Sequence, residues 1–206
     1  MSLSFKGLRL DLFMDSRMDL QLKFLKEIDK LKLIKRQGIV SDGSRRENSA
    51  EHSWHMAMFI ILFEKELPEN LDTAKALKLA IVHDLIEIYA DDTPIYDKTM
   101  SATQEKREMD AAKKLFSQLP EDLAKEFMNL FLEFEEMKTK EAVFVKSFDK
   151  LHGVFQNLCE NGQAWKNCGV TIDMIENHKR KYMDHDETMT KLFDAMLKEG
   201  KDRGLL

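Results

Sequence analysis

The chain has 206 residues, a formal net charge of -5 and 43% apolar residues. This length suffices for one hydrophobic core, and the composition excludes a disordered chain. The negative charge excludes the broad basic surface that binding to duplex nucleic acid requires. Glycine and proline are scarce, at 8 and 3 residues, which predicts long helices with few turns.

The sequence also predicts a protein of the cytoplasm that does not enter a membrane. Its longest apolar run, from Met56 to Phe63, is far too short to span a bilayer. No signal peptide opens the chain. The two cysteines, Cys159 and Cys168, lack the spacing of a metal site, so we expect reduced thiols.

The N-terminal part is predicted to hold one helix followed by a polar loop. Residues 1–16 show no clear periodicity, and we expect a flexible segment there. Apolar residues at helical spacing predict a helix over 17–36 that ends near Gly38. A polar loop over 41–49 follows. Three arginines lie in or beside it: Arg36, Arg45 and Arg46. Without further observations, a solvated basic rim is the simpler interpretation.

A second helix is predicted to begin at Ser49, whose side chain can act as its N-cap. His52 and His55 share its apolar face. A histidine in such a place is more often a core residue than a ligand. His52, however, lies in the first turn, near the loop and therefore near solvent and substrate. Spacing alone does not separate the two histidines.

The third predicted helix, over 72–90, carries a polar stripe in apolar surroundings. His83, Asp84 and Glu87 fall on one arc of it. Buried carboxylates and imidazoles are costly unless something compensates them, and a divalent cation binds both ligand types. A His-Asp pair that only hydrogen-bonds a neighbour explains the pattern equally well. Asp92 follows in a turn, where ordinary turn chemistry also accounts for it.

Four more helices complete the predicted fold, over 102–117, 123–137, 138–160 and 172–197. Residues 165–169 are expected to connect the last two. Asp149 lies among apolar residues of the third of these helices. It either pairs with Lys146 or Lys150, or it supplies a further metal ligand. His178 and His185 are expected to be surface residues.

The order of these residues resembles the HD-domain superfamily of metal-dependent phosphohydrolases. His52 comes first, the His83-Asp84 pair follows, and Asp149 comes last. The flanking segments are similar to those of the 5'-deoxynucleotidase branch, namely 31–36, 45–53, 83–87, 92–94 and 145–150. The resemblance covers about residues 19–194. It implies an all-α fold, a single HD domain over 1–206 built as a bundle of about seven helices.

The resemblance also implies a site. One divalent metal ion, whose identity among Mn, Co, Mg, Zn, Fe and Ni the sequence does not distinguish, is expected on four ligands: His52, His83, Asp84 and Asp149. Arg36 is expected to hold the substrate phosphate, and Glu87 and Asp92 to act on the attacking water. The implied substrates are nucleoside 5'-monophosphates, especially 2'-deoxy ones. Relatives of this kind are commonly homodimers.

Some positions depart from the pattern of the branch. Gln37 stands where relatives often carry tryptophan, and Asp91 where glycine is frequent. His55 occupies a position that is usually not a ligand, so it is left out of the metal set. No histidine occurs between His83 and His152, which favours one metal ion over two.

Two other classes of function stay open. The chain could be an HD-fold hydrolase of another nucleotide, a diester or a pyrophosphate such as guanosine tetraphosphate, and the products would distinguish it. A non-catalytic nucleotide-sensing module is the second alternative, and the full ligand set with Glu87 and Asp92 argues against it. A structural alternative also exists for the two acids: Glu87 pairs only with a base such as Arg45, and Asp92 only caps its turn.

Overall fold

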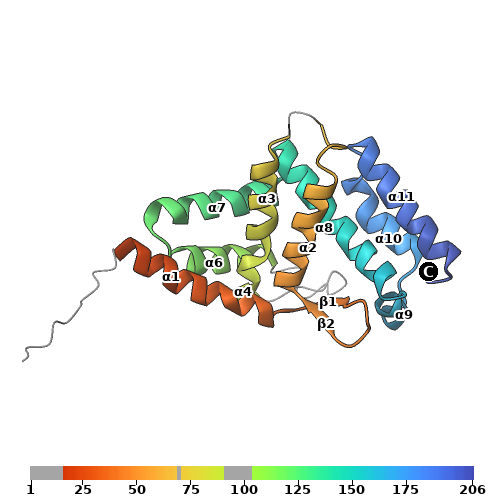
Figure 1. Cartoon of the computed structure of the whole chain (residues 1–206), viewed down its shortest axis with the longest axis horizontal. Coiled ribbons are helices and arrows are strands. Elements are labelled where there is room, and N and C mark those ends of the chain that lie inside the picture. Colours follow the sequence, from red (N-terminus) through yellow and green to blue (C-terminus); the bar gives the residue numbers. More distant parts are fainter. Residues whose placement is uncertain (1–15, 69–70, 91–103) are drawn as a thin grey trace, which may run out of the picture.

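The structure is a computed structural model that describes residues 16–68, 71–90 and 104–206. Helices dominate these ranges, as predicted, and one two-stranded hairpin accompanies them (Figure 1). Within them, no helix is both long and apolar enough to cross a membrane. Residues 1–15, expected to be flexible, and Asp92, expected in the site, lie outside the described residues.

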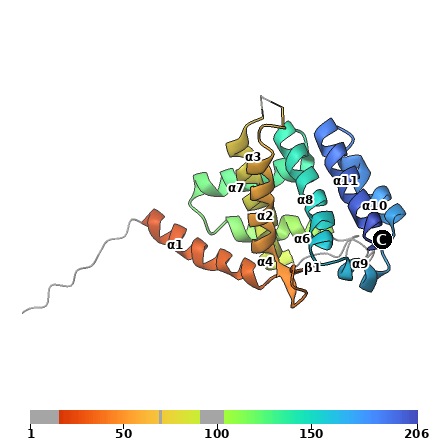
Figure 2. The same cartoon turned by 45° about the vertical axis from the view of Figure 1, so that its right-hand side comes forward.

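Three helices pack against one another in the middle of the molecule: α2 (Ser49–Leu62), α3 (Thr73–Val82) and α8 (Lys140–Cys159). Figures 1 and 2 show them side by side from two directions. Their facing side chains are apolar and fully buried, among them Met56 and Ile60 of α2, Ala80 of α3 and Phe148 of α8. Burial of this apolar surface is the main source of stability for the bundle.

The remaining helices flank this centre on two sides. On one side lie α1 (Ser16–Ile28), α6 (Gln104–Phe116) and α7 (Glu121–Glu136), and on the other α9 (Gln163–Cys168), α10 (Ile172–Lys179) and α11 (Glu187–Asp202) (Figure 1). Phe24 of α1 contacts Phe127 of α7 edge to face, at 5.6 Å between ring centroids. This contact joins α1 to α7 on that side of the central helices.

The predicted first helix, over 17–36, is too long. After α1 the chain forms a 3-10 turn, η1 (Asp29–Leu33), and then strand β1 (Lys35–Ile39). This strand pairs antiparallel with β2 (Arg46–Asn48), and the register is irregular between its ends. The segment predicted as a polar loop therefore includes a hairpin, and Arg36 lies on a strand instead of a helix end.

The predicted helix over 72–90 is divided into three parts. It begins as expected, because the Asp72 side chain accepts a hydrogen bond from the backbone N of Lys75. After α3 the helix tightens into a 3-10 turn, η2 (His83–Ile86), and resumes as α4 (Glu87–Ala90). Side chains three residues apart lie above one another in a 3-10 turn. Asp84 and Glu87 are therefore brought onto one side of the segment.

The C-terminal part is more divided than predicted. Residues 165–169 were expected as a connection, but most of them belong to α9. The single helix predicted over 172–197 is replaced by α10, a 3-10 turn η3 (Arg180–Tyr182) and α11. The cause is a new N-cap: the Asp186 carboxylate accepts hydrogen bonds from the backbone N of Thr188 and of Met189.

Candidate functional site

The four residues predicted as metal ligands meet in one buried place between α2, η2 and α8: His52, His83, Asp84 and Asp149. Ligand atoms of His52, His83 and Asp149 lie within 4.8 Å of one another. The Asp84 carboxylate lies beside both imidazoles, with Oδ1 at 2.9 Å from His83 Nε2 and Oδ2 at 3.8 Å from His52 Nε2. Three elements far apart in sequence thus assemble a compact set of nitrogen and oxygen donors.

The two histidines turn the same nitrogen toward this place. Nε2 of His52 and Nε2 of His83 are buried and make no hydrogen bond in the described part of the chain, although carboxylate oxygens lie close, Asp149 Oδ1 at 3.2 Å from the first and Asp84 Oδ1 at 2.9 Å from the second. His83 Nδ1 lies 2.9 Å from the Ala80 carbonyl oxygen, which only accepts, so Nδ1 carries the proton. Burial, together with the charge of Arg36, lowers the pKa of His52 to about 4. A neutral imidazole with an unused buried Nε2 fits a metal ion.

The two aspartates are held in the charged form. Burial alone would raise the pKa of the Asp149 carboxyl group, but Lys150 and His52 hold it well below its usual range. Burial also opposes ionisation of Asp84, and the neighbouring His83 and Arg36 outweigh it, so that this pKa is lowered as well. Asp149 does pair with Lys150, at 2.7 Å, as one interpretation of the sequence had it. That contact leaves its Oδ1 at 3.2 Å from His52 Nε2.

Arg36 reaches into the cluster from β1. Its guanidinium lies within 4 Å of four carboxylates, those of Glu47, Asp84, Glu87 and Asp149. Nη1 donates to Asp84 Oδ2 at 2.6 Å and approaches Glu87 Oε1 at 3.4 Å. The cationic side chains of Arg36 and Lys150 lie against these four carboxylates and balance part of their negative charge. A divalent cation matches the remaining negative charge.

Glu47 is a member of this cluster that the sequence reasoning missed. It is buried on β2, and a Cβ atom on Gly38 would lie only 2.7 Å from its Oε1. Gly38 therefore does not end a helix; it lets the Glu47 carboxylate approach the backbone of β1 closely. Glu47 followed an arginine in a segment that looked like a solvated loop. Its inward direction depends on the strand pairing.

Glu87 is oriented by the residue that was expected to cap α2. Asn48 takes the capping role instead: its side chain accepts from the backbone N of Glu51, and the Glu51 carboxylate accepts from the backbone N of Asn48, each at 3.0 Å. The buried Ser49 hydroxyl is thereby free to donate to Glu87 Oε2, at 2.5 Å. One carboxylate oxygen of Glu87 is fixed by Ser49 and the other faces Arg36.

The hairpin arginines separate into different roles. Arg45 forms two hydrogen bonds with the Glu51 carboxylate, at 2.9 and 2.7 Å, on the exposed side of α2. In the structural alternative for Glu87, the base that it contacts is therefore Arg36 and not Arg45. Of Arg36 and Arg45, Arg36 is the one whose guanidinium contacts Glu87.

A cavity of about 330 Å³ opens beside the cluster. Arg36, Asp84 and Glu87 line it, and so does His178, which is exposed as expected. The remaining walls combine lysines, aromatic rings and two acids, among them Lys146, Lys150, Lys179, Lys181, Phe131, Phe134, Tyr182, Glu108 and Glu135. Ammonium groups attract an anion, and aromatic rings pack against a flat apolar group.

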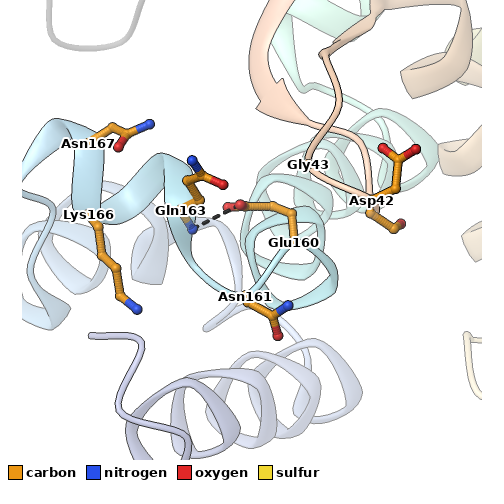
Figure 3. A pocket seen from close by; sticks show the side chains of 8 residues that line it. Asp42, Gly43, Glu160, Asn161, Gln163, Lys166 and Asn167 are labelled. Atoms are coloured by element: carbon orange, nitrogen blue, oxygen red, sulfur yellow. Dashed lines mark hydrogen bonds between the residues drawn. The ribbon is translucent and has the colours of Figure 1, made fainter.

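A second cavity, of about 480 Å³, lies between the loop at Asp42 and Gly43 and the start of α9 (Figure 3). The Glu160 carboxylate faces it, but its oxygens accept from the backbone N of Gln163 at 2.8 Å and of Ala164 at 2.9 Å. This acid therefore serves as a helix cap. The two cavities share no lining residue. The cluster around His52 and its cavity define the candidate site.

This helical bundle, with histidines and aspartates from three helical elements in one buried cluster, is an HD domain. The model of the HD domain family matches residues 28–192, and the chain belongs to this family. The resemblance in the sequence is thus confirmed at the level of family and helical fold.

Several curated proteins and solved structures are similar to the chain. The 5'-deoxynucleotidase HDDC2 of Dictyostelium discoideum is 36% identical over 141 residues, which cover 66% of this chain and 74% of that protein. The human protein of the same name is 31% identical over 136 residues, covering 66% and 65%. The crystal structure of a predicted metal-dependent phosphohydrolase from Magnetospirillum magnetotacticum superposes with a TM-score of 0.85 at 36% identity, covering 93% of this chain and 99% of that one.

Proposed function

We propose that this protein is a metal-dependent phosphomonoesterase that releases phosphate from nucleoside 5'-monophosphates, with 2'-deoxynucleotides preferred. The observation that carries the proposal is a buried cluster in which two imidazole Nε2 atoms make no hydrogen bond and a guanidinium contacts Asp84, beside a cavity lined by charged and aromatic side chains. The names of the related 5'-deoxynucleotidases support the choice of substrate.

One divalent ion per chain is proposed to bind to His52, His83, Asp84 and Asp149. The neutral state of His52 and the ionised state of both aspartates support this ligand set. Such an ion would lower the pKa of a bound water molecule and polarise a phosphoryl oxygen.

The other residues of the cluster bind and transfer protons. Arg36 holds the substrate phosphate through two parallel N–H donors, a geometry that suits phosphate oxygens. Glu87 accepts a proton from the water that attacks phosphorus, while Ser49 keeps its Oε2 in place. The bond between phosphorus and the 5' oxygen then breaks, and the proton that Glu87 took from the water passes to the 5' oxygen, so that the nucleoside leaves as an alcohol. Asp92 is proposed, from the sequence alone, to help orient the same water.

The cavity walls are proposed to bind the parts of the substrate beyond the contact with Arg36. Lys146 and Lys150 are paired with Glu135 and Asp149, at 3.1 and 2.7 Å, and Lys179 donates to a backbone carbonyl. The lining holds five cationic and five acidic side chains, so the proposed metal ion would supply the excess positive charge that attracts a doubly charged phosphate. The rings of Phe131 and Tyr182 offer apolar surfaces for the base or sugar.

A phosphate-release screen tests the proposal. Deoxynucleoside 5'-monophosphates, their ribonucleotide counterparts and the matching 3'-monophosphates are incubated with the protein and Mn, Co, Mg, Zn, Fe or Ni. We expect inorganic phosphate from the 5'-monophosphates and much less from the 3'-isomers. Equal turnover of both isomers would defeat the nucleotidase assignment. Release of pyrophosphate from guanosine tetraphosphate would favour the second hydrolase class, and binding without turnover under every metal would favour a sensing module.

We also propose a homodimer, a single HD domain and a place in the cytoplasm. Trp54, Ile61 and Leu62 are 63%, 49% and 69% exposed, and their spacing puts them on one face of α2. A second copy of the chain is the proposed partner for this face.

One cluster of buried side chains connects the helices, which supports one domain. The cysteines Cys159 and Cys168 are free thiols, which supports a reducing compartment.

A further inference from the structure

Behind the candidate metal ligands, three imidazoles form a chain of hydrogen bonds. His52 Nδ1 lies 3.0 Å from His152 Nδ1, and His152 Nε2 lies 3.1 Å from His55 Nδ1. The rings of neighbouring members cross nearly at right angles, at 86° and 83°. His52 and His152 are 1% and 0% exposed, whereas His55 is half-buried beneath the exposed Trp54. The chain therefore runs from the cluster to the outer face of α2.

The position of His52 dictates the direction of every hydrogen bond in this chain. A neutral imidazole has one N–H donor and one acceptor nitrogen. If Nε2 of His52 is the ligand nitrogen, its Nδ1 carries the proton and donates to His152 Nδ1. His152 must then carry its own proton on Nε2 and donate to His55 Nδ1. The remaining N–H of His55 lies at its Nε2.

The comparison with His83 shows what the three hydrogen-bonded imidazoles do for His52. Nδ1 of His83 donates to a backbone carbonyl, which fixes both the ring and its protonation. No such carbonyl contact exists at His52 among the described residues; the imidazole of His152 occupies the corresponding place. With both rings buried, water does not substitute for the acceptor, and an unpaired N–H there would be costly.

We propose that His152 is a positioning residue for the metal centre: it accepts the Nδ1 proton of His52 and so holds Nε2 toward the ion, and His55 in turn orients His152. This inference rests on the proposed metal site. Partners that orient a ligating histidine typically raise metal affinity by 10- to 100-fold. His55 thus acts on the metal centre only through His152, and it is not a ligand in this proposal.

A second cation is the competing explanation, because Glu47, His52 and His152 also bring ligand atoms within 4.8 Å of one another. An ion between His52 and His152 would need a lone pair on Nδ1 of His52, while Nε2 of the same ring serves the first ion. Such a ring would have to lose both protons. The 3.0 Å separation of the two Nδ1 atoms is the length of a hydrogen bond.

The first experiment replaces the acceptor while preserving volume. His152→Leu removes the acceptor, whereas His152→Gln supplies an amide oxygen for His52 and an amide N–H for His55. We expect Co²⁺ or Mn²⁺ to bind about 10- to 100-fold more weakly to His152→Leu, and His152→Gln to bind nearly as wild type. His185→Leu, a change at an exposed histidine on another segment, is the control. Wild-type affinity in a folded His152→Leu protein, or equal loss in both variants, would overturn the proposal.

The second experiment needs no variant and therefore does not depend on whether His152→Leu folds. Long-range proton-nitrogen NMR spectra of the Zn²⁺-loaded protein show which nitrogen of each imidazole carries hydrogen. We expect Nδ1 for His52 and Nε2 for both His152 and His55. A proton on Nδ1 of His152, or more than one ion per chain, would contradict the inference. If the ion binds in this way but no nucleotide is hydrolysed, the proposed function fails and the positioning role stands.

Discussion

Arg36 donates through Nη1 to Asp84 Oδ2 at 2.6 Å, so the proposed phosphate ligand lies against a proposed metal ligand. The nitrogens of the same guanidinium also lie near two other carboxylates, Nη1 at 3.4 Å from Glu87 Oε1 and Nη2 at 3.9 Å from Asp149 Oδ1. A phosphate that enters the cavity therefore meets a donor already directed at the place where the ion is proposed to bind. Binding of substrate and neutralisation of the carboxylates depend on one side chain.

Replacement of Arg36 should chiefly weaken substrate binding. A hydrogen bond to a charged group contributes about 1.5–3 kcal/mol, so we expect kcat/KM of Arg36→Ala to fall about 10- to 150-fold, with most of the change in KM. Steady-state kinetics on a deoxynucleoside 5'-monophosphate measures this. Arg45→Ala, which breaks the exposed pair with Glu51, is the matched control. A wild-type Arg36→Ala beside an impaired Arg45→Ala would show that the wrong arginine was chosen.

Removal of a ligand should remove the ion. We expect near-complete loss of bound metal in His83→Ala and Asp149→Ala, and retention in His55→Ala, by elemental analysis after gel filtration. An ion at a concentration about 100 times its Kd stabilises the folded state by about 2.7 kcal/mol, so wild type should melt at a higher temperature with metal than with chelator. Asp149→Ala should not show this shift. Stoichiometric metal in Asp149→Ala would remove that residue from the set.

Glu87→Gln preserves shape and removes the base. General acid-base groups contribute about 100- to 10,000-fold in rate, and we expect a loss of kcat in that range with metal content and melting temperature unchanged. Asp92→Asn should behave similarly. Ser49→Ala, which frees Glu87 Oε2, should have a smaller effect on kcat. Variants that melt earlier but keep most of their kcat would instead support a structural role for these acids.

Lys179 gives the substrate affinity a pH dependence. Burial, and then the nearby charge of Lys150, lowers the pKa of Lys179 to about 8. A lysine is charged below its pKa and neutral above it, so the cavity loses one positive charge as the pH rises through about 8. We expect KM for a nucleotide to increase across that range in wild type and to change less in Lys179→Gln. Lys181→Gln, at an exposed position of the same cavity, should keep the wild-type profile.

The apolar face of α2 should govern assembly. We expect the wild-type chain to elute as a dimer in size-exclusion chromatography with light scattering, and Leu62→Glu to elute as a monomer with an unchanged circular dichroism spectrum. The burial of large apolar groups provides the driving force. Leu25→Glu, a charge at another exposed leucine on α1, should leave the dimer intact. A monomeric wild type would refute the proposed interface.

The residues of the site that the sequence could predict are those with a local signature. His83, Asp84 and Glu87 lie within one turn or two of each other, and His52 and Asp149 lie on amphipathic helices, so periodicity alone turned them inward. Glu47 could not be found this way, because its inward direction depends on the hairpin register. Periodicity also turns His152 inward, three residues after Asp149, but its contact with His52 crosses 100 residues of sequence and could not be predicted.

The fold shows the same division. The spacing of apolar residues predicted where helices occur. It did not predict where they begin and end, because the ends depend on side-chain contacts that have no periodic pattern. Asn48 displaced Ser49 as the cap because Glu51 completes a capping box. Asp186 began a new helix inside an apolar pattern that continues on both sides. A polar residue immediately before a helical stretch was the available signal in each case.

The 3-10 turn at η2 makes the spacing between Asp84 and Glu87 a fixed length. With three residues per turn, the two carboxylates are one full rotation apart, and an insertion or deletion between them would rotate Glu87 by about 120° away from Ser49 and Arg36. Viable descendants of this chain should therefore never gain or lose a residue within the segment from His83 to Glu87, which a library of single-residue insertions can test directly.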